Sequence, residues 1–192
     1  LMVDQALISG CCGGLFENLA AVSDIMGDDT IPGSGPSLGV NPASLPVMAD
    51  LMSQGIAGRL VKNGVTIRPC ICGPCFGVTD VPANNGLSIR HVTRNYPNRE
   101  GSKPGQGQMA AVCLMDSRSI AATMKNGGRL TAATELEVEY HNWHHQFDGS
   151  IYQGQVYDCY GKGDPQEKLA MGPNIADWPQ MYGPGKHLLL KT

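Results

Sequence analysis

Two turns rich in glycine and cysteine, each placed directly after a short apolar segment, limit the folds open to this chain. The first turn, Gly10-Cys11-Cys12-Gly13-Gly14, follows the apolar run Ala6-Leu7-Ile8, and the second occupies residues 70–77 after the apolar residues 65–68. A short apolar run that ends in glycine is typical of a buried strand. Apolar residues then recur at helical spacing over residues 15–26. The pattern therefore predicts a strand, a tight turn and a helix in succession.

The same alternation continues along the chain. Further strands are predicted near residues 38–40 and 87–93, and further helices over residues 45–60 and 108–127. Alternating strands and helices predict the α/β class, here a three-layer α/β/α domain with a mostly parallel sheet. Because open α/β sheets bind ligands at the carboxyl ends of their strands, we expect the two cysteine turns to form one shared site.

The character of the sequence changes near residue 135. Aromatic residues, histidine and proline become frequent there, and the periodicity weakens. We therefore expect an α/β domain over residues 1–135 and an extended arm or linker over residues 136–192. The chain begins inside an apolar segment and ends just after the apolar run 188–190, so we expect it to be a piece of a longer protein with a further C-terminal domain.

Composition excludes several classes of partner. With 192 residues, of which 42% are hydrophobic, the chain can bury a core. A net charge of −3 gives no broad basic surface, so neither nucleic acid nor an anionic membrane is indicated as a partner. No apolar run approaches the roughly 18 residues that span a bilayer. The seven cysteines are odd in number and unevenly spaced, which indicates a reducing compartment: the cytoplasm, or the mitochondrial matrix in a eukaryote.

Three cysteines stand out as candidate metal ligands: Cys11 in the first turn and the C-x-x-C pair Cys72 and Cys75 in the second. Soft thiolates in this number suit an iron-sulfur cluster. With three protein ligands, one iron stays open and can act as a Lewis acid. Because C-x-x-C also occurs in redox and structural zinc sites, zinc remains an alternative. Cys70 could replace Cys72 in a C-x4-C pair.

Three motifs resemble the aconitase family, in the family's order. Ile8-Ser9-Gly10-Cys11-Cys12-Gly13-Gly14 is similar to its I-G-S-C-T-N-G turn, Cys72-Gly73-Pro74-Cys75 matches its C-G-P-C motif, and residues 93–99 resemble its R-N-(F/Y)-x-x-R motif. The resemblance covers about residues 7–136 and is nearest to the bacterial aconitase-like hydratases in a family that includes the isopropylmalate isomerases. It implies the third, cluster-bearing domain of such an enzyme.

The resemblance also implies roles for individual residues. Cys11, Cys72 and Cys75 would ligate a 4Fe-4S cluster, and Arg94 and Arg99 would bind substrate carboxylates, a task for which guanidinium groups are suited by bidentate geometry. The implied reaction is the reversible dehydration of a hydroxy-polycarboxylate of the citrate/isocitrate type. The family's serine base is expected outside this chain, which therefore holds no catalytic base and is expected to be inactive alone. The expected partners are a di- or tricarboxylate and the remaining domains of the enzyme.

Departures from the family pattern leave alternatives open. Cys12-Gly13 stands where the family usually has Thr-Asn, and Thr93 where many members have Asn, so a catalytically degenerate iron-sulfur or regulatory protein is the second hypothesis. Citrate, homocitrate, methylcitrate and isopropylmalate remain possible acids. For Arg90, substrate binding and a structural role are equally open. The other expectations are a buried Cys12, a helix-core Cys113, an inert Cys159 and a histidine-rich surface loop at His141, Trp143, His144 and His145 rather than a metal site.

Overall fold

The computed structural model describes residues 1–93, 97–98, 100–154, 161–166 and 168. By its internal contacts the chain divides into two compact units, Leu1–Gln155 and Val156–Thr192. Every helix and strand reported below lies in the first unit. Among the described residues, no helix has both the length and the apolar character needed to cross a membrane.

A parallel sheet of five strands forms the centre of this unit. The strand order is β3-β2-β1-β4-β5, and every pair of neighbours runs parallel. The strands are β1 (Gln5–Ser9), β2 (Ser37–Asn41), β3 (Thr66–Ile67), β4 (Leu87–His91) and β5 (Ala111–Leu114). The first four coincide with the strands predicted from the apolar runs. The order places β1, which precedes the first cysteine turn, in the middle of the sheet.

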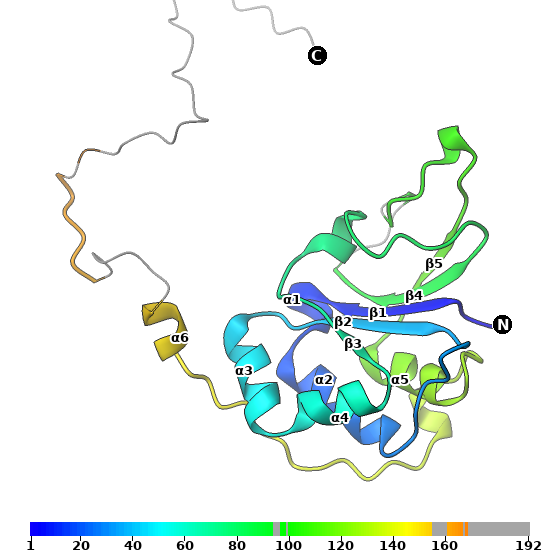
Figure 1. The fold of residues 1–192 in the computed structure, drawn as a ribbon, viewed down its shortest axis with the longest axis horizontal. Coiled ribbons are helices and arrows are strands. Elements are labelled where there is room, and N and C mark those ends of the chain that lie inside the picture. The colour runs from blue at the N-terminus through cyan, green and yellow to red at the C-terminus, as the bar shows by residue number, and fades with distance from the viewer. Residues whose placement is uncertain (94–96, 99, 155–160, 167, 169–192) are drawn as a thin grey trace, which may run out of the picture. The chain divides into compact units, whose positions relative to one another are not determined.

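Four helices lie together on one side of the sheet (Figure 1). They are α2 (Phe16–Met26), α3 (Leu45–Ser53), α4 (Ile56–Lys62) and α5 (Ser117–Lys125). Because side chains alternate between the faces of a strand, Ala6 and Ile8 of β1 point into the core beneath these helices, together with Val40 and Ile89. The predicted α/β class and parallel sheet are confirmed, and the arrangement is consistent with the three-layer α/β/α fold.

The second cysteine segment lies over the other face of the sheet. It contains a short 3-10 helix, η1 (Gly73–Phe76), on the side opposite the four helices (Figure 1). The strand residues that face it include Leu7, Gly39 and the charged Arg90, which is buried. The carbonyl oxygens of Pro74 and Asp80 in this segment accept hydrogen bonds from Arg90. This segment, rather than a long helix, therefore covers that face within the described residues.

The helix predicted over residues 108–127 was wrong in its first half. Residues 111–114 form β5 and pair with β4, and α5 begins only at Ser117. The reason is a cap: the Asp116 carboxylate accepts hydrogen bonds from the backbone N–H groups of Arg118 (2.9 Å) and Ser119 (3.1 Å). An N-cap residue has extended backbone and fixes where a helix starts. Cys113 is consequently an exposed strand residue and not a helix-core thiol.

The helix predicted over residues 45–60 is divided in two. Gly55 has a φ of 75° and separates α3 from α4. Glycine adopts this left-handed conformation at no steric cost, so the chain turns there. The apolar face expected from the helical spacing is retained in part: Leu51, Ile56 and Leu60 are fully buried, whereas Leu45 at the start of α3 is exposed.

Residues 136–148, called the strap below, contain no helix or strand and pass along the helix layer. Asp24 of α2, whose side chain is only 1% exposed, anchors the strap at one point. Its carboxylate accepts hydrogen bonds from the His141 N–H (3.0 Å), His141 Nδ1 (2.9 Å) and Trp143 Nε1 (3.0 Å). Arg59 Nη1 of α4 lies 3.6 Å from the same carboxylate.

A second buried carboxylate, Asp50 of α3, holds the next part of the strap. It accepts hydrogen bonds from His145 Nδ1 (2.6 Å), the Gln146 N–H (2.6 Å) and Gln54 Nε2 (2.8 Å). The His145 ring also stacks on Phe16, with 5.3 Å between ring centroids. His141 and His145 of this segment thus bind helix-layer aspartates. The domain boundary predicted at residue 135 stays a prediction.

Asp50→Asn should destabilise the protein by about 1 to 3 kcal/mol at pH 7, because a neutral amide is a weaker acceptor and would face His145 and Gln146 with a wrongly placed donor. Burial alone would raise the pKa of Asp50, but hydrogen bonds from Gln54, Gln146 and His145 outweigh it and hold that pKa below its usual 3.8. A carboxylate with a lowered folded-state pKa stabilises the fold above its unfolded-state pKa and loses this effect as pH falls through the folded-state value.

The wild-type protein should therefore lose part of its unfolding free energy as pH falls below about 4, and Asp50→Asn should lose less over the same range. Urea unfolding at pH 7, 4 and 3 checks both effects. Asp28→Asn is the control, because Asp28 is an exposed aspartate in the α2–β2 loop. It should change stability by less than about 0.5 kcal/mol. Equal effects of the two substitutions would contradict the role given to Asp50.

Candidate functional site

Cys11 lies at the carboxyl end of the central strand. β1 ends at Ser9, and the next four residues form the single-turn helix α1 (Gly10–Gly13), in which Cys11 is exposed. Gly10 has a φ of 68°, and a side-chain carbon placed on it would lie 3.5 Å from Cys75 Sγ. Because 3.5 Å is an ordinary van der Waals contact, the left-handed backbone of the tight turn is what favours glycine at this position.

Cys72 and Cys75 flank the first turn of η1. Cys72 is the exposed N-cap residue, Cys75 is 2% exposed, and the Cys75 N–H donates to the Cys72 carbonyl (3.1 Å). Gly73 between them has no room for a side chain, because an added carbon would lie 2.8 Å from Thr79 Oγ1. Pro74 in the first turn suits a short helix, since its fixed φ is already helical.

The structure brings the two turns together at Thr93. Thr93 Oγ1 lies 3.9 Å from Cys11 Sγ and 3.8 Å from Cys75 Sγ, so two cysteines separated by 64 positions in the sequence approach one hydroxyl group. Thr93 follows β4, the neighbour of β1. Cys11 and Cys75 thus lie at the same edge of the sheet, as expected, and their forming one shared site stays a prediction.

The chemistry of the donors fits a thiolate-bound cluster. Cys11 and Cys75 are thiols in no disulfide bond, and Cys72 adds a third cysteine sulfur from the same turn as Cys75, at the same edge of the sheet. At the same edge, the buried Ser9 Oγ and Asn41 Oδ1 find no hydrogen-bond partner among the described residues. Across those residues, however, no three potential ligands from His, Cys, Asp and Glu are gathered closely enough to hold a metal ion.

Cys70, the alternative to Cys72, is in a different environment. Burial raises the pKa of the Cys70 thiol, which disfavours the thiolate that a metal requires. Cys12 is half-buried beside Cys11. Arg94, Arg99 and Cys159, which the sequence analysis also named, lie outside the described residues.

Residues at the ends of β2 and β3 hold the second cysteine segment in place. Asn41 Nδ2 donates to the Pro69 carbonyl (2.9 Å), and the Arg68 N–H donates to the Val40 carbonyl (2.8 Å). Arg68 Nη2 forms an ion pair with the buried Asp80 Oδ1 at 2.5 Å. The segment between Pro69 and Asp80 is therefore fixed at both ends by the sheet.

Sequence reasoning missed His91, the last residue of β4. His91 lines a pocket of about 310 Å³ together with Cys12 and Asp116, at the carboxyl edge beside the cysteines. Its Nδ1 lies 2.6 Å from Ser117 Oγ, and burial lowers the pKa of His91, which favours the neutral imidazole. A titratable residue at the end of a predicted strand was the signal that could have identified it.

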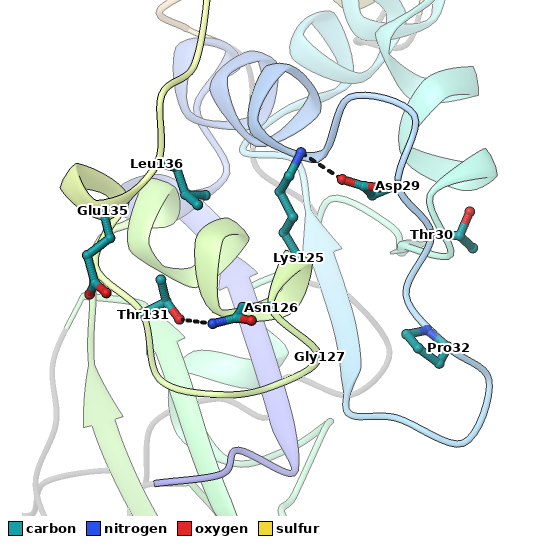
Figure 2. A pocket seen from close by; sticks show the side chains of 9 residues that line it. All are labelled: Asp29, Thr30, Pro32, Lys125, Asn126, Gly127, Thr131, Glu135 and Leu136. Carbon is teal, nitrogen blue, oxygen red and sulfur yellow. Dashed lines mark hydrogen bonds and ion pairs between the residues drawn. The ribbon is translucent and has the colours of Figure 1, made fainter.

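A second pocket, of about 480 Å³, lies at the amino ends of β1 and β2 and contains none of the predicted site residues (Figure 2). Figure 2 shows that its polar groups already bind one another: Lys125 Nζ pairs with Asp29 Oδ2 at 2.8 Å, and Asn126 Nδ2 donates to Thr131 Oγ1 at 2.9 Å. Lys125 Nζ also donates to the Ile25 carbonyl (2.8 Å) at the end of α2. These contacts indicate a structural role for the lysine.

Comparison with known proteins identifies relatives of this chain. The model of the aconitase family (aconitate hydratase) matches residues 1–122. A 3-isopropylmalate dehydratase large subunit 2 from Pyrococcus furiosus is 30% identical over 105 residues, which make up 54% of this chain and 27% of that protein. The 2,3-dimethylmalate dehydratase large subunit of Eubacterium barkeri is 28% identical over 135 residues, covering 70% and 30%.

A probable 3-isopropylmalate dehydratase large subunit from Methanosarcina mazei is 35% identical over 104 residues, covering 52% of this chain and 24% of that protein. The chain therefore spans between about a quarter and a third of the length of these relatives.

Gly13→Ala should destabilise the protein by about 1 to 3 kcal/mol, because the added carbon would lie 2.2 Å from the His91 carbonyl oxygen, a backbone atom that cannot rotate away. Gly58→Ala is the matched control: Gly58 is exposed within α4, and an added carbon there meets no atom within 4 Å. It should stabilise the protein by about 0.5 to 1 kcal/mol through helix propensity. Thermal unfolding of both variants checks the pair, and a neutral Gly13→Ala would contradict the close packing of α1 on β4.

Proposed function

This chain belongs to the aconitase family, and we propose from this that it forms the iron-sulfur part of a hydro-lyase acting on a hydroxy di- or tricarboxylate. The observation that carries the proposal is the approach of Cys11 and Cys75, from two separate turns, to the Thr93 hydroxyl at the carboxyl edge of the sheet. Because the chain spans only part of its relatives' length, the activity belongs to a longer protein or complex that contains it.

The proposed cofactor is a 4Fe-4S cluster held by Cys11, Cys72 and Cys75. When bound by three thiolates, such a cluster leaves one iron without a protein ligand and supplies a Lewis acid for a substrate hydroxyl group. The raised pKa of Cys70 and the exposure of Cys72 support Cys72 as the third ligand. Thr93 contributes a hydroxyl group at van der Waals distance from two of the three sulfur atoms.

Arg94 and Arg99 are proposed to bind the substrate carboxylates. They lie outside the described residues, but Thr93, which directly precedes Arg94, lies beside the two sulfur atoms. Permanently charged guanidinium groups bind carboxylates bidentately and so can fix both the position and the orientation of a polycarboxylate.

The proposed reaction is an elimination of water. The carbon–oxygen bond of the substrate hydroxyl breaks, a proton leaves the adjacent carbon, and the electron pair of that C–H bond forms a carbon–carbon double bond. The base that takes the proton is proposed to lie in another part of the full protein, as the resemblance to the family implies.

The proposed class of substrate is broader than the citrate/isocitrate type that the resemblance implied. The relatives are dehydratases named for 3-isopropylmalate and 2,3-dimethylmalate, which are hydroxy dicarboxylates. The malate unit common to these names supports a hydroxy dicarboxylate as the minimal substrate.

A second candidate is a degenerate iron-sulfur or regulatory protein of the same family. It is favoured by Cys12-Gly13, where the family usually has Thr-Asn, because the packing of Gly13 against the His91 carbonyl leaves no space for an asparagine side chain. An amide that could contact cluster or substrate is thus replaced by a bare backbone.

The deciding experiment uses full-length protein, reconstituted anaerobically with iron and sulfide and analysed for iron, sulfide and zinc. The EPR signal of the reduced protein is then followed while 3-isopropylmalate, 2,3-dimethylmalate, citrate or cis-aconitate is added. A signal that shifts with one acid, together with a rise in ultraviolet absorbance from a new double bond, supports the hydro-lyase. A signal that no acid shifts, without turnover, supports the degenerate protein, and zinc in place of iron overturns both.

Cysteine substitutions should identify the ligands. Cys11→Ser, Cys72→Ser and Cys75→Ser should each lower the iron bound after reconstitution by more than about tenfold, because a serine alkoxide is a poor replacement for a thiolate. Cys70→Ser tests the alternative ligand and should retain the wild-type iron content. Cys113→Ser is the control for an exposed thiol on β5 and should also retain it. Loss of iron in Cys70→Ser but not in Cys72→Ser would reverse the assignment.

A further inference from the structure

Arg90 is a charged residue buried on the face of the sheet that the second cysteine segment covers. Its exposed fraction is 1%, and the guanidinium lies between β4 and the segment. Arg90 Nη1 donates to the Pro74 carbonyl (3.2 Å), and Arg90 Nη2 donates to the Asp80 carbonyl (2.7 Å). Pro74 is part of the Cys72-Gly73-Pro74-Cys75 motif, so this side chain bonds directly to the backbone between the two cysteines.

The other donors of Arg90 bind the sheet. Arg90 Nε donates to Ser88 Oγ (2.9 Å) and Nη2 to Gln5 Oε1 (3.1 Å), while Ser88 Oγ donates to Gln5 Oε1 (2.8 Å). Ser88 lies two residues before Arg90 on β4, and Gln5 is its partner in the β1–β4 register. The guanidinium thus joins the two central strands to the cysteine segment.

The charges around Arg90 compensate for its burial. Burial lowers the pKa of Arg90, and attraction to Glu100, Asp80 and Cys75 acts in the opposite direction. Glu100 is itself buried and accepts a hydrogen bond from Ser102 Oγ; both residues directly follow the motif at residues 93–99. A buried charge is tolerated when hydrogen bonds and opposite charges surround it, and both are present here.

We propose that Arg90 is a positioning residue that holds the Cys72–Cys75 turn against the sheet before any cofactor binds. The sheet supplies a rigid base at Ser88 and Gln5, and the guanidinium carries this rigidity across to the Pro74 and Asp80 carbonyls. The link to a cluster rests on the proposed function, whereas the effect on the cysteine turn does not. Ligands that are held in position before binding cost less entropy to order when the ligand group arrives.

The proposal requires arginine and not merely a positive charge. Arg90 uses Nε, Nη1 and Nη2 for four acceptors that lie on two strands and in two parts of the segment. The ammonium group of lysine is a compact point with three donors and cannot reach acceptors so far apart. Arg90→Lys therefore preserves the charge and removes the bridge.

The test measures access to Cys75 in full-length, cluster-free protein. The alkylation rate of Cys75 by iodoacetamide is followed by mass spectrometry, with fragment spectra separating it from Cys70 and Cys72 and the exposed Cys113 as internal reference. In Arg90→Lys the Cys75 rate should rise about tenfold relative to Cys113, the factor expected when a hydrogen bond from a charged group no longer holds the closed turn. Iron bound after reconstitution should fall in parallel.

Arg59→Lys is the matched control, since Arg59 also pairs with a buried aspartate but lies in the helix layer, away from the cysteine segment. It should leave the Cys75 alkylation rate unchanged even where it lowers the melting temperature.

Ser88→Ala removes one acceptor of Arg90 with little change in volume and should raise the Cys75 alkylation rate about twofold to threefold. If Arg90→Lys does not fold, Ser88→Ala alone decides the test. An unchanged Cys75 rate in folded Arg90→Lys, or an equal rise in Arg59→Lys, overturns the proposal. Because alkylation needs neither cluster nor substrate, this outcome is independent of the hydro-lyase test.

Discussion

The parallel pairing of β1 with β2 on one side and β4 on the other is the constraint on which the site depends. Parallel strands end at the same edge of a sheet, so the segments that follow β1, β2 and β4 must emerge side by side. The segment after β1 begins with the turn of Cys11, and the segment after β4 contains Thr93. The approach of Cys11 and Cys75 to Thr93 therefore follows from strand order and register rather than from any contact between nearby residues in the sequence.

Buried charge organises both faces of this sheet in the same physical way. On the helix side, Asp24 and Asp50 bind the strap through histidine, tryptophan and backbone donors. On the other side, Arg90 binds the cysteine segment through backbone carbonyls. In each case a charged group fixed on regular structure satisfies the backbone of a segment that has little regular structure of its own. Such segments cannot satisfy their own backbone polar groups by a regular ladder of hydrogen bonds. A single charged side chain can form hydrogen bonds with several of these groups.

Local sequence patterns predicted much of the fold and went wrong where tertiary contacts decide. The four strands read from apolar runs are confirmed, and the apolar spacing identified buried residues of α2 and α4 but only Leu51 of α3, where Leu45 is exposed. Residues 111–114 resemble the start of a helix by composition, but their pairing with β4 makes them a strand. The histidine-rich segment was predicted as a surface loop. The sequence could not show that His141 and His145 bind Asp24 and Asp50, which lie more than 90 positions away in the chain.

The sequence by itself determined the class of fold, the family and the identity of the candidate ligands, because motif spacing and apolar periodicity are local properties that survive without coordinates. Only the tertiary structure decided which thiols approach Thr93, why Gly13 can carry no side chain, and that the buried Arg90 side chain binds the Pro74 and Asp80 carbonyls. These are contacts between residues far apart in the chain. Their existence depends on strand order and on which face of the sheet each side chain occupies, and neither can be read from a window of neighbouring residues.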